Sequence, residues 1–239
     1  MTQTQNQGPG NQPPESRSEA ALLRSLGKLA RGLSALFWGL PVTLVVSAET
    51  ARADWLKPLG MLPELATNGL LLYGLWQMGG FQKSERRWLR ALDRAKLLAL
   101  INLGLCPFVY WHNKVPGELF FTLMVVLLQI SALLFLFTLN HVIERLGAML
   151  PDETLRQETR QFTALNRSLL ITLVLLVLAY LGLNWLPNPS PRISLVLVWM
   201  ENGGFWLLVF FALLPLAMTM ALLWKTKEVI LDSVFGSRR

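Results

Sequence analysis

Long apolar stretches alternate along the chain with short polar and charged segments. An α-helix needs roughly 20 mostly apolar residues to cross a hydrocarbon layer about 30 Å thick. Prolines at 41 and 107 and Gly74 interrupt the first three stretches, whereas the last three are more uniformly apolar. The pattern predicts an all-α, polytopic membrane helical bundle of about six transmembrane helices. The predicted spans are residues 33–48, 65–81, 97–111, 119–140, 169–186 and 205–224.

The composition supports burial in lipid. Of the 239 residues, 53% are hydrophobic and only 15% are charged, whereas soluble domains carry about 25% charged residues. The mean hydropathy is +0.42. A single cysteine, Cys106, excludes an internal disulfide framework and a multi-cysteine metal site.

The distribution of basic residues predicts the orientation. With the N-terminus in the cytoplasm, only four of the 22 lysines and arginines fall outside: Arg52, Lys57, Lys114 and Arg192. This asymmetry follows the positive-inside rule and predicts three hairpins with both termini inside. The net charge of +7 is then a signal of topology and does not indicate nucleic-acid binding. A basic inner face also suits anionic lipid headgroups. We expect a multi-pass protein of a bacterial-type inner (plasma) membrane.

Three segments are expected along the chain. Residues 1–18 are rich in Gln, Asn, Pro, Gly and Ser, and predict a disordered cytoplasmic tail. Residues 19–224 form the transmembrane helical domain, and residues 225–239 a short cytoplasmic C-terminal segment. The Val-Ser-Ala sequence ending at Ala48 resembles a signal-peptidase site, and cleavage there would leave five spans. Pro41 and the long segment before the apolar stretch argue against cleavage.

The inner segment from residue 144 to 167 is the longest loop between predicted spans. Pro151 and Asp152 predict a helix start. A helix at the membrane surface, or one that runs into the next span, is the favoured interpretation. The alternative is a docking helix for a cytoplasmic partner. Leu155, Phe162 and Leu165 give this helix a loose apolar stripe.

Polar residues within the predicted spans are the first candidates for chemistry. Ionisable residues in the middle of a span usually indicate transport or proton relay. None of the predicted spans contains one. Gln77, Asn102 and Gln129 are neutral, and hydrogen bonding between helices is their favoured role. The alternative is a polar pathway through the bundle.

Three glutamates lie near the expected outer ends of the second, fourth and sixth spans: Glu64, Glu118 and Glu201. The helix dipole favours a negative charge there, and a cation-attracting ring at an outer mouth is the competing interpretation. His112 and His141 fall at opposite membrane faces about 30 Å apart, so they cannot share a metal ion. His141 is the better candidate for a pH-sensitive group.

Catalytic and cofactor-binding motifs are missing from the sequence. It contains no phosphate-binding glycine loop, His-Glu-x-x-His or Gly-x-Ser-x-Gly pattern. We therefore predict no catalytic, cofactor-binding or metal-binding residues and expect no cofactor. The function expected is a non-enzymatic anchor, scaffold or assembly subunit of a membrane complex, with a membrane or cytoplasmic protein partner. A small solute transporter or channel is the alternative, and a membrane enzyme comes third.

Overall fold

The computed structural model of the chain describes residues 14–52, 57–81, 85–149, 153–184 and 205–235. Regular structure in these ranges is helical throughout, which confirms the all-α prediction. The elements are α1 (Pro14–Arg52), the short 3₁₀-helix η1 (Lys57–Leu59), α2 (Leu62–Met78), α3 (Arg86–Leu105), α4 (Pro107–Lys114), α5 (Leu119–Met149), α6 (Glu153–Asn184) and α8 (Phe205–Phe235).

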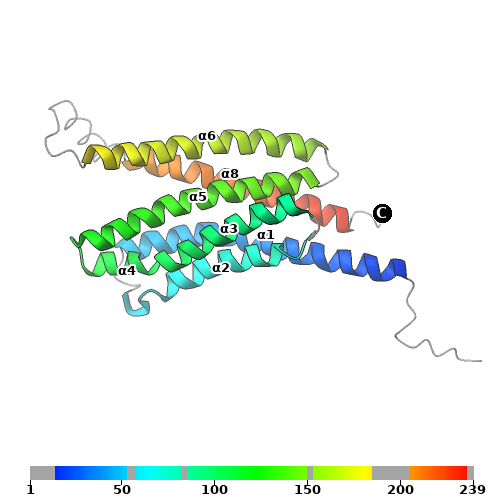
Figure 1. Ribbon diagram of the computed structural model, residues 1–239, viewed down its shortest axis with the longest axis horizontal. Helices are drawn as coiled ribbons and strands as arrows, with labels where there is room; N and C mark the ends of the chain where they lie inside the picture. Colours follow the sequence, from blue (N-terminus) through cyan, green and yellow to red (C-terminus); the bar gives the residue numbers. More distant parts are fainter. Residues whose placement is uncertain (1–13, 53–56, 82–84, 150–152, 185–204, 236–239) are drawn as a thin grey trace, which may run out of the picture.

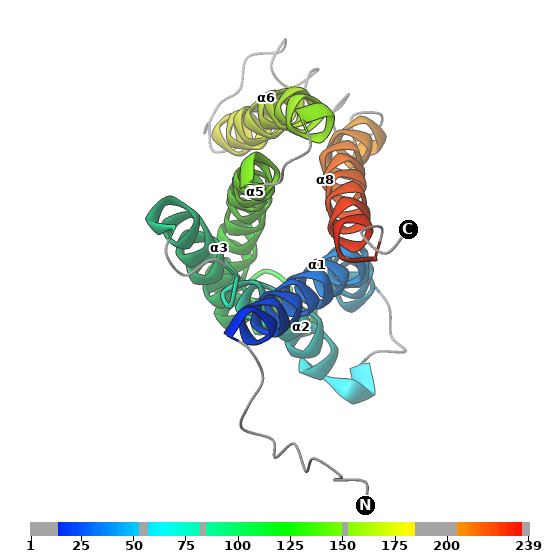
Figure 2. The same cartoon turned by 90° about the vertical axis from the view of Figure 1, so that its right-hand side faces the viewer.

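The long helices lie side by side and run alternately in opposite directions (Figure 1). Each long helix packs on the next in the order α1, α2, α3, α5, α6 and α8, and α8 packs back on α1. Viewed along the bundle, the helices form a closed ring (Figure 2). The first and last described helices are therefore neighbours, so the chain forms one continuous bundle.

Three helices within the described residues are long and apolar enough to cross a membrane. They are Leu23–Thr50 in α1, Leu119–Met149, which is all of α5, and Thr159–Ala179 in α6. They overlap the first, fourth and fifth predicted spans. The membrane character expected from the sequence is thus supported by three of the six predicted spans.

Leucine-rich packing fills the interior of the ring. Each long helix spaces its buried residues three or four apart, which is the period of one helical face. Fully buried large side chains come from every long helix; they include Leu29, Leu33, Leu36, Leu75, Met78, Trp88, Leu92, Leu139, Ile143, Leu146, Leu170, Leu223 and Ile230. From α8, Leu222, Leu223 and Ile230 join the same core.

Two glycines let α1 and α2 touch backbone to backbone. A Cβ atom built on Gly32 would lie 2.6 Å from the Gly74 carbonyl oxygen, and one built on Gly74 would lie 3.0 Å from the Gly32 carbonyl oxygen. Small residues permit such close helix contacts in membranes. Gly74, which interrupts the second predicted span, is therefore a packing position.

Several helix ends differ from the predicted boundaries. Helix α1 begins at Pro14, inside the segment expected to be a tail, while residues 1–13 lie outside the described residues. Helix α8 continues without a break from Phe205 to Phe235, so most of the expected C-terminal segment is helical. Pro107 lies between α3 and α4, in the first turn of α4, where its missing N–H costs no helical hydrogen bond. Pro41 and Pro215, by contrast, lie inside α1 and α8.

The segment before the fifth predicted span is also a helix. Pro151 and Asp152 lie outside the described residues, and α6 begins directly after them at Glu153. It continues to Asn184 in one piece. This agrees with the interpretation that the inner segment runs into the next span.

Candidate functional site

A buried polar cluster joins α5, α6 and α8 inside the apolar core. It consists of Asn140, Asn166 and Thr219, which we call the asparagine cluster; each is at most 2% exposed. The Asn166 Nδ2 atom lies 3.0 Å from Asn140 Oδ1 and 3.0 Å from Thr219 Oγ1. It also lies 3.3 Å from the Pro215 carbonyl oxygen. The amide of a single residue thus links three helices.

The other contacts of the cluster complete the network. Asn140 Nδ2 donates to Thr219 Oγ1 at 3.0 Å and to the Leu136 carbonyl oxygen at 2.8 Å. The Thr219 hydroxyl donates its only proton to the Pro215 carbonyl oxygen at 2.7 Å, so its lone pairs are free to accept from both amides. This cluster was not predicted from the sequence, because its members are far apart along the chain.

Helix α6 buries a polar stripe and exposes an apolar one. Thr159, Thr163 and Asn166 are at most 6% exposed, whereas Phe162 and Leu165 are 46% and 56% exposed. This is the arrangement expected when the surroundings are lipid and polar groups find partners between helices. Buried leucines, Leu170 and Leu173, follow the polar stripe at the same helical period. The spacing of Thr159, Thr163 and Asn166 was a signal in the sequence.

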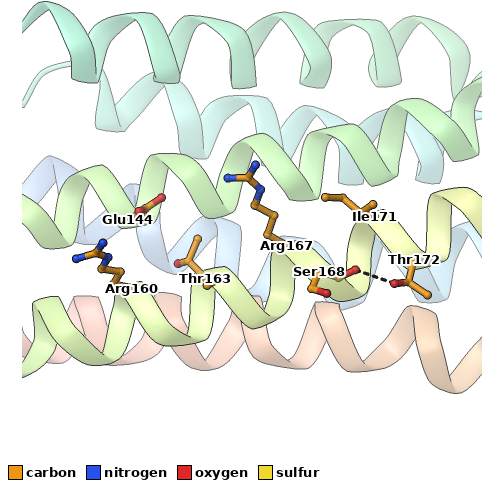
Figure 3. Close-up of a pocket in the computed structure, with 8 residues that line it drawn as sticks. Glu144, Arg160, Thr163, Arg167, Ser168, Ile171 and Thr172 are labelled. Atoms are coloured by element: carbon orange, nitrogen blue, oxygen red, sulfur yellow. Dashed lines mark hydrogen bonds between the residues drawn. The ribbon is translucent and has the colours of Figure 1, made fainter.

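A groove of about 440 Å³ lies beside this stripe, between α5 and α6 (Figure 3). Its polar lining consists of Glu144 from α5 and five residues of α6: Arg160, Thr163, Arg167, Ser168 and Thr172. The Arg167 guanidinium lies 5.7 Å from the centre of the Phe137 ring of α5. The Thr172 hydroxyl donates to the Ser168 carbonyl oxygen at 3.0 Å.

The predicted outer-mouth acids occupy different environments. Glu64 lies in the first turn of α2, as the dipole argument expects, but only 1% of it is exposed. Burial raises the pKa of this carboxyl, and the nearby Ser47 and Thr50 side chains of α1 oppose the shift. Glu118 is exposed just before α5, and Glu201 lies outside the described residues. Glu64 is therefore a buried acid, and the outer-mouth role of the three glutamates stays a prediction.

The three candidate pathway residues do not meet. Gln77 donates to the Tyr73 hydroxyl of its own helix at 2.7 Å. Asn102 is buried, at 4% exposure, and Gln129 is exposed on α5. Gln129 thus faces away from the core, and Gln77 pairs within its own helix. The pathway role stays a prediction, and the contact of Gln77 is local rather than between helices.

The histidines lie on different helices, each beside a polar neighbour. His112 Nδ1 lies 3.5 Å from Thr122 Oγ1. His141 Nδ1 lies 3.4 Å from the Glu144 Oε2 atom, one turn away on α5. Among the described residues, no group of three or more His, Cys, Asp or Glu side chains could hold a metal ion. The pH-sensitive role of His141 stays a prediction.

These features define an all-helical protein with three helices able to cross a membrane, a packed core and a buried amide cluster. Comparison with protein-family models finds no match, and comparisons with curated proteins and with solved structures find none either.

Proposed function

We propose that this protein is a non-enzymatic membrane anchor and assembly subunit of a larger complex. The observation that carries the proposal is the filled interior. Leucines from α1 and α2 meet Trp88 and Leu92 of α3 in one continuous apolar core. Helix α5 contributes Leu139, Val142, Ile143 and Leu146 to the same core. A solute path needs a hydrated interior with polar lining. This core is instead filled with packed apolar side chains.

The helices also extend beyond the membrane at one end. Helix α5 has 31 residues, which corresponds to roughly 46 Å of helix against a hydrocarbon layer of about 30 Å. The end of α5 lies at the same end of the bundle as the start of α1, the start of α6 and the end of α8 (Figure 1). In the proposed topology this is the cytoplasmic end of six helices arranged as three hairpins, with both termini inside.

That end offers a rigid, basic platform. Exposed side chains there include Arg24, Lys28, Arg87, Arg90 and Arg94. Such residues suit either anionic headgroups or an acidic protein surface. A platform that continues rigidly into the membrane can hold a partner at a fixed distance from a bacterial-type inner membrane, which is the proposed location.

One observation favours the runner-up, a small transporter or channel. The Glu64 carboxylate oxygens are buried and have no well-aligned hydrogen-bond partner among the described residues. A buried carboxyl of this kind is typical of sites that bind protons or cations. Glu64 stands at the outer end of the bundle, however, and the leucine core lies between it and the other end.

Site-specific photo-crosslinking in cells tests the proposal. Crosslinkers placed at Arg24 and at Arg90 should each give a discrete adduct with the same protein. A crosslinker at Lys114, exposed at the opposite end, is the matched control and should give none. The transporter would be favoured if neither basic-end position gave an adduct and if liposomes that contain only this protein showed solute flux.

A further inference from the structure

We propose that the groove between α5 and α6 binds the phosphate of an anionic phospholipid, whose acyl chains lie along the exposed apolar part of α6. This inference needs α6 to cross the membrane and does not depend on the subunit role.

The groove carries more positive than negative side chains. Arg160 and Arg167 are two helical turns apart and both line the groove, and Glu144 is the one acid in its lining. Guanidinium groups recognise phosphate through paired, charge-assisted hydrogen bonds. The contact with the Phe137 ring holds Arg167 on the α5 side of the groove, where Figure 3 shows its side chain pointing toward α5.

The groove also contains a buried hydroxyl group that lacks a hydrogen-bond partner among the described residues. Thr163 lines the groove between the two arginines and is 6% exposed. Its hydroxyl oxygen is buried and has no hydrogen-bond partner among the residues that the structure describes. Buried polar groups are almost always paired, so this hydroxyl indicates a missing partner. A phosphate oxygen held by the two arginines supplies that partner.

The face of α6 that lines the groove indicates that the phosphate belongs to a lipid. Positions 160, 164, 167, 171, 175 and 178 form one face of α6, since they recur three or four residues apart. The face is basic at its first turns and then becomes apolar. Ile171, Leu175 and Leu178 are 45%, 61% and 48% exposed. This change from charge to exposed hydrocarbon along a helix able to cross a membrane matches a lipid headgroup followed by its acyl chains. A free phosphate ion would make no contact with the exposed apolar residues of α6.

Native mass spectrometry of the purified full-length protein in a neutral detergent tests the proposal. Phosphatidylglycerol, phosphatidylcholine and inorganic phosphate are titrated separately. We expect saturable phosphatidylglycerol adducts and clearly weaker phosphatidylcholine adducts. Inorganic phosphate should neither bind nor displace the lipid.

Variants locate the bound lipid. The double variant Arg160→Gln with Arg167→Gln should weaken phosphatidylglycerol binding by about tenfold or more. Thr163→Val keeps the side-chain volume, removes the hydroxyl and should weaken binding by a smaller factor. The control is Lys114→Gln, which removes an exposed basic residue at the opposite end of the bundle and should leave binding unchanged.

Three results would overturn the proposal. Equal binding of both lipids would show that the groove does not recognise an anionic headgroup. Displacement of the lipid by inorganic phosphate would assign the groove to a free anion. An equal loss of binding in the control variant would show that general surface charge attracts the lipid and that the groove is not a site.

Discussion

Replacement of Asn166 by leucine tests whether the asparagine cluster holds the second half of the bundle together. The substitution keeps the side-chain volume close to native and removes the amide. Asn166 is fully buried and its Nδ2 group faces three acceptors, two at 3.0 Å and one at 3.3 Å. Since an amide nitrogen carries two protons, the variant loses the equivalent of two full hydrogen bonds.

The expected cost follows from these contacts. Side-chain hydrogen bonds between membrane helices contribute about 0.6 kcal/mol on average and up to about 1.7 kcal/mol. The Asn140 Oδ1 atom also loses the donor that pairs with it, which adds about 1 kcal/mol for an unpaired buried acceptor. We therefore expect Asn166→Leu to lower the free energy of unfolding by about 1–3 kcal/mol.

Equilibrium unfolding in mixed micelles, followed by tryptophan fluorescence, measures this change. The matched control is Gln129→Leu, which makes the same kind of replacement at an exposed position of α5 and should change stability by less than about 0.5 kcal/mol. A double-mutant cycle with Thr219→Val should show coupling of about 0.5–1.5 kcal/mol, because both residues share one network. If Asn166→Leu costs no more than the control, the cluster does not stabilise the bundle.

Further expectations follow from other positions. Because burial raises the pKa of Glu64, the folded state holds a proton more tightly than the unfolded state, so stability should fall as the pH rises above the ordinary glutamate value of about 4.3. Glu64→Gln should remove this pH dependence and be more stable than wild type at alkaline pH; melting curves with the same slope against pH for both proteins would contradict the assignment. Gly32→Ala should destabilise by about 1–3 kcal/mol, because its Cβ would meet the Gly74 carbonyl, while Gly69→Ala, which meets nothing within 4 Å, should be neutral or stabilising in the same unfolding assay. For the topology, a membrane-impermeant maleimide should label Lys114→Cys in intact cells and Arg90→Cys only after permeabilisation; the reverse pattern would invert the proposed orientation.

The sequence predicted the helices well where apolar residues dominate. The uninterrupted stretch from 119 to 140 lies within α5, and Pro107 begins a new helix. Pro41 and Pro215 do not end α1 and α8, which continue through them. The boundaries were less accurate wherever a helix continues past its apolar part. Charged residues after Trp224 ended the predicted span, but the backbone of α8 continues because nothing in that segment breaks a helix.

The site was harder to predict, since it depends on contacts between distant residues. Glu64 was expected near a helix N-terminus because the helix dipole favours a negative charge there. It does lie in the first turn of α2, but α1 packs on α2 and Glu64 is buried. Asn166 lay outside the predicted fifth span, at the edge of a basic inner segment, so its burial was not anticipated. In soluble proteins apolar side chains face the core and polar ones face the solvent. In lipid a polar stripe can face inward while leucines face outward. Only the helical spacing of Thr159, Thr163 and Asn166 indicated this arrangement in the sequence.

The proposed role as an assembly subunit is tested most directly by purifying the tagged protein at native expression in a mild detergent and identifying what accompanies it by mass spectrometry. The account predicts one protein partner in a fixed stoichiometry, crosslinked to the basic end of the bundle. Recovery of the chain alone, as a discrete monomer or homo-oligomer, would contradict it.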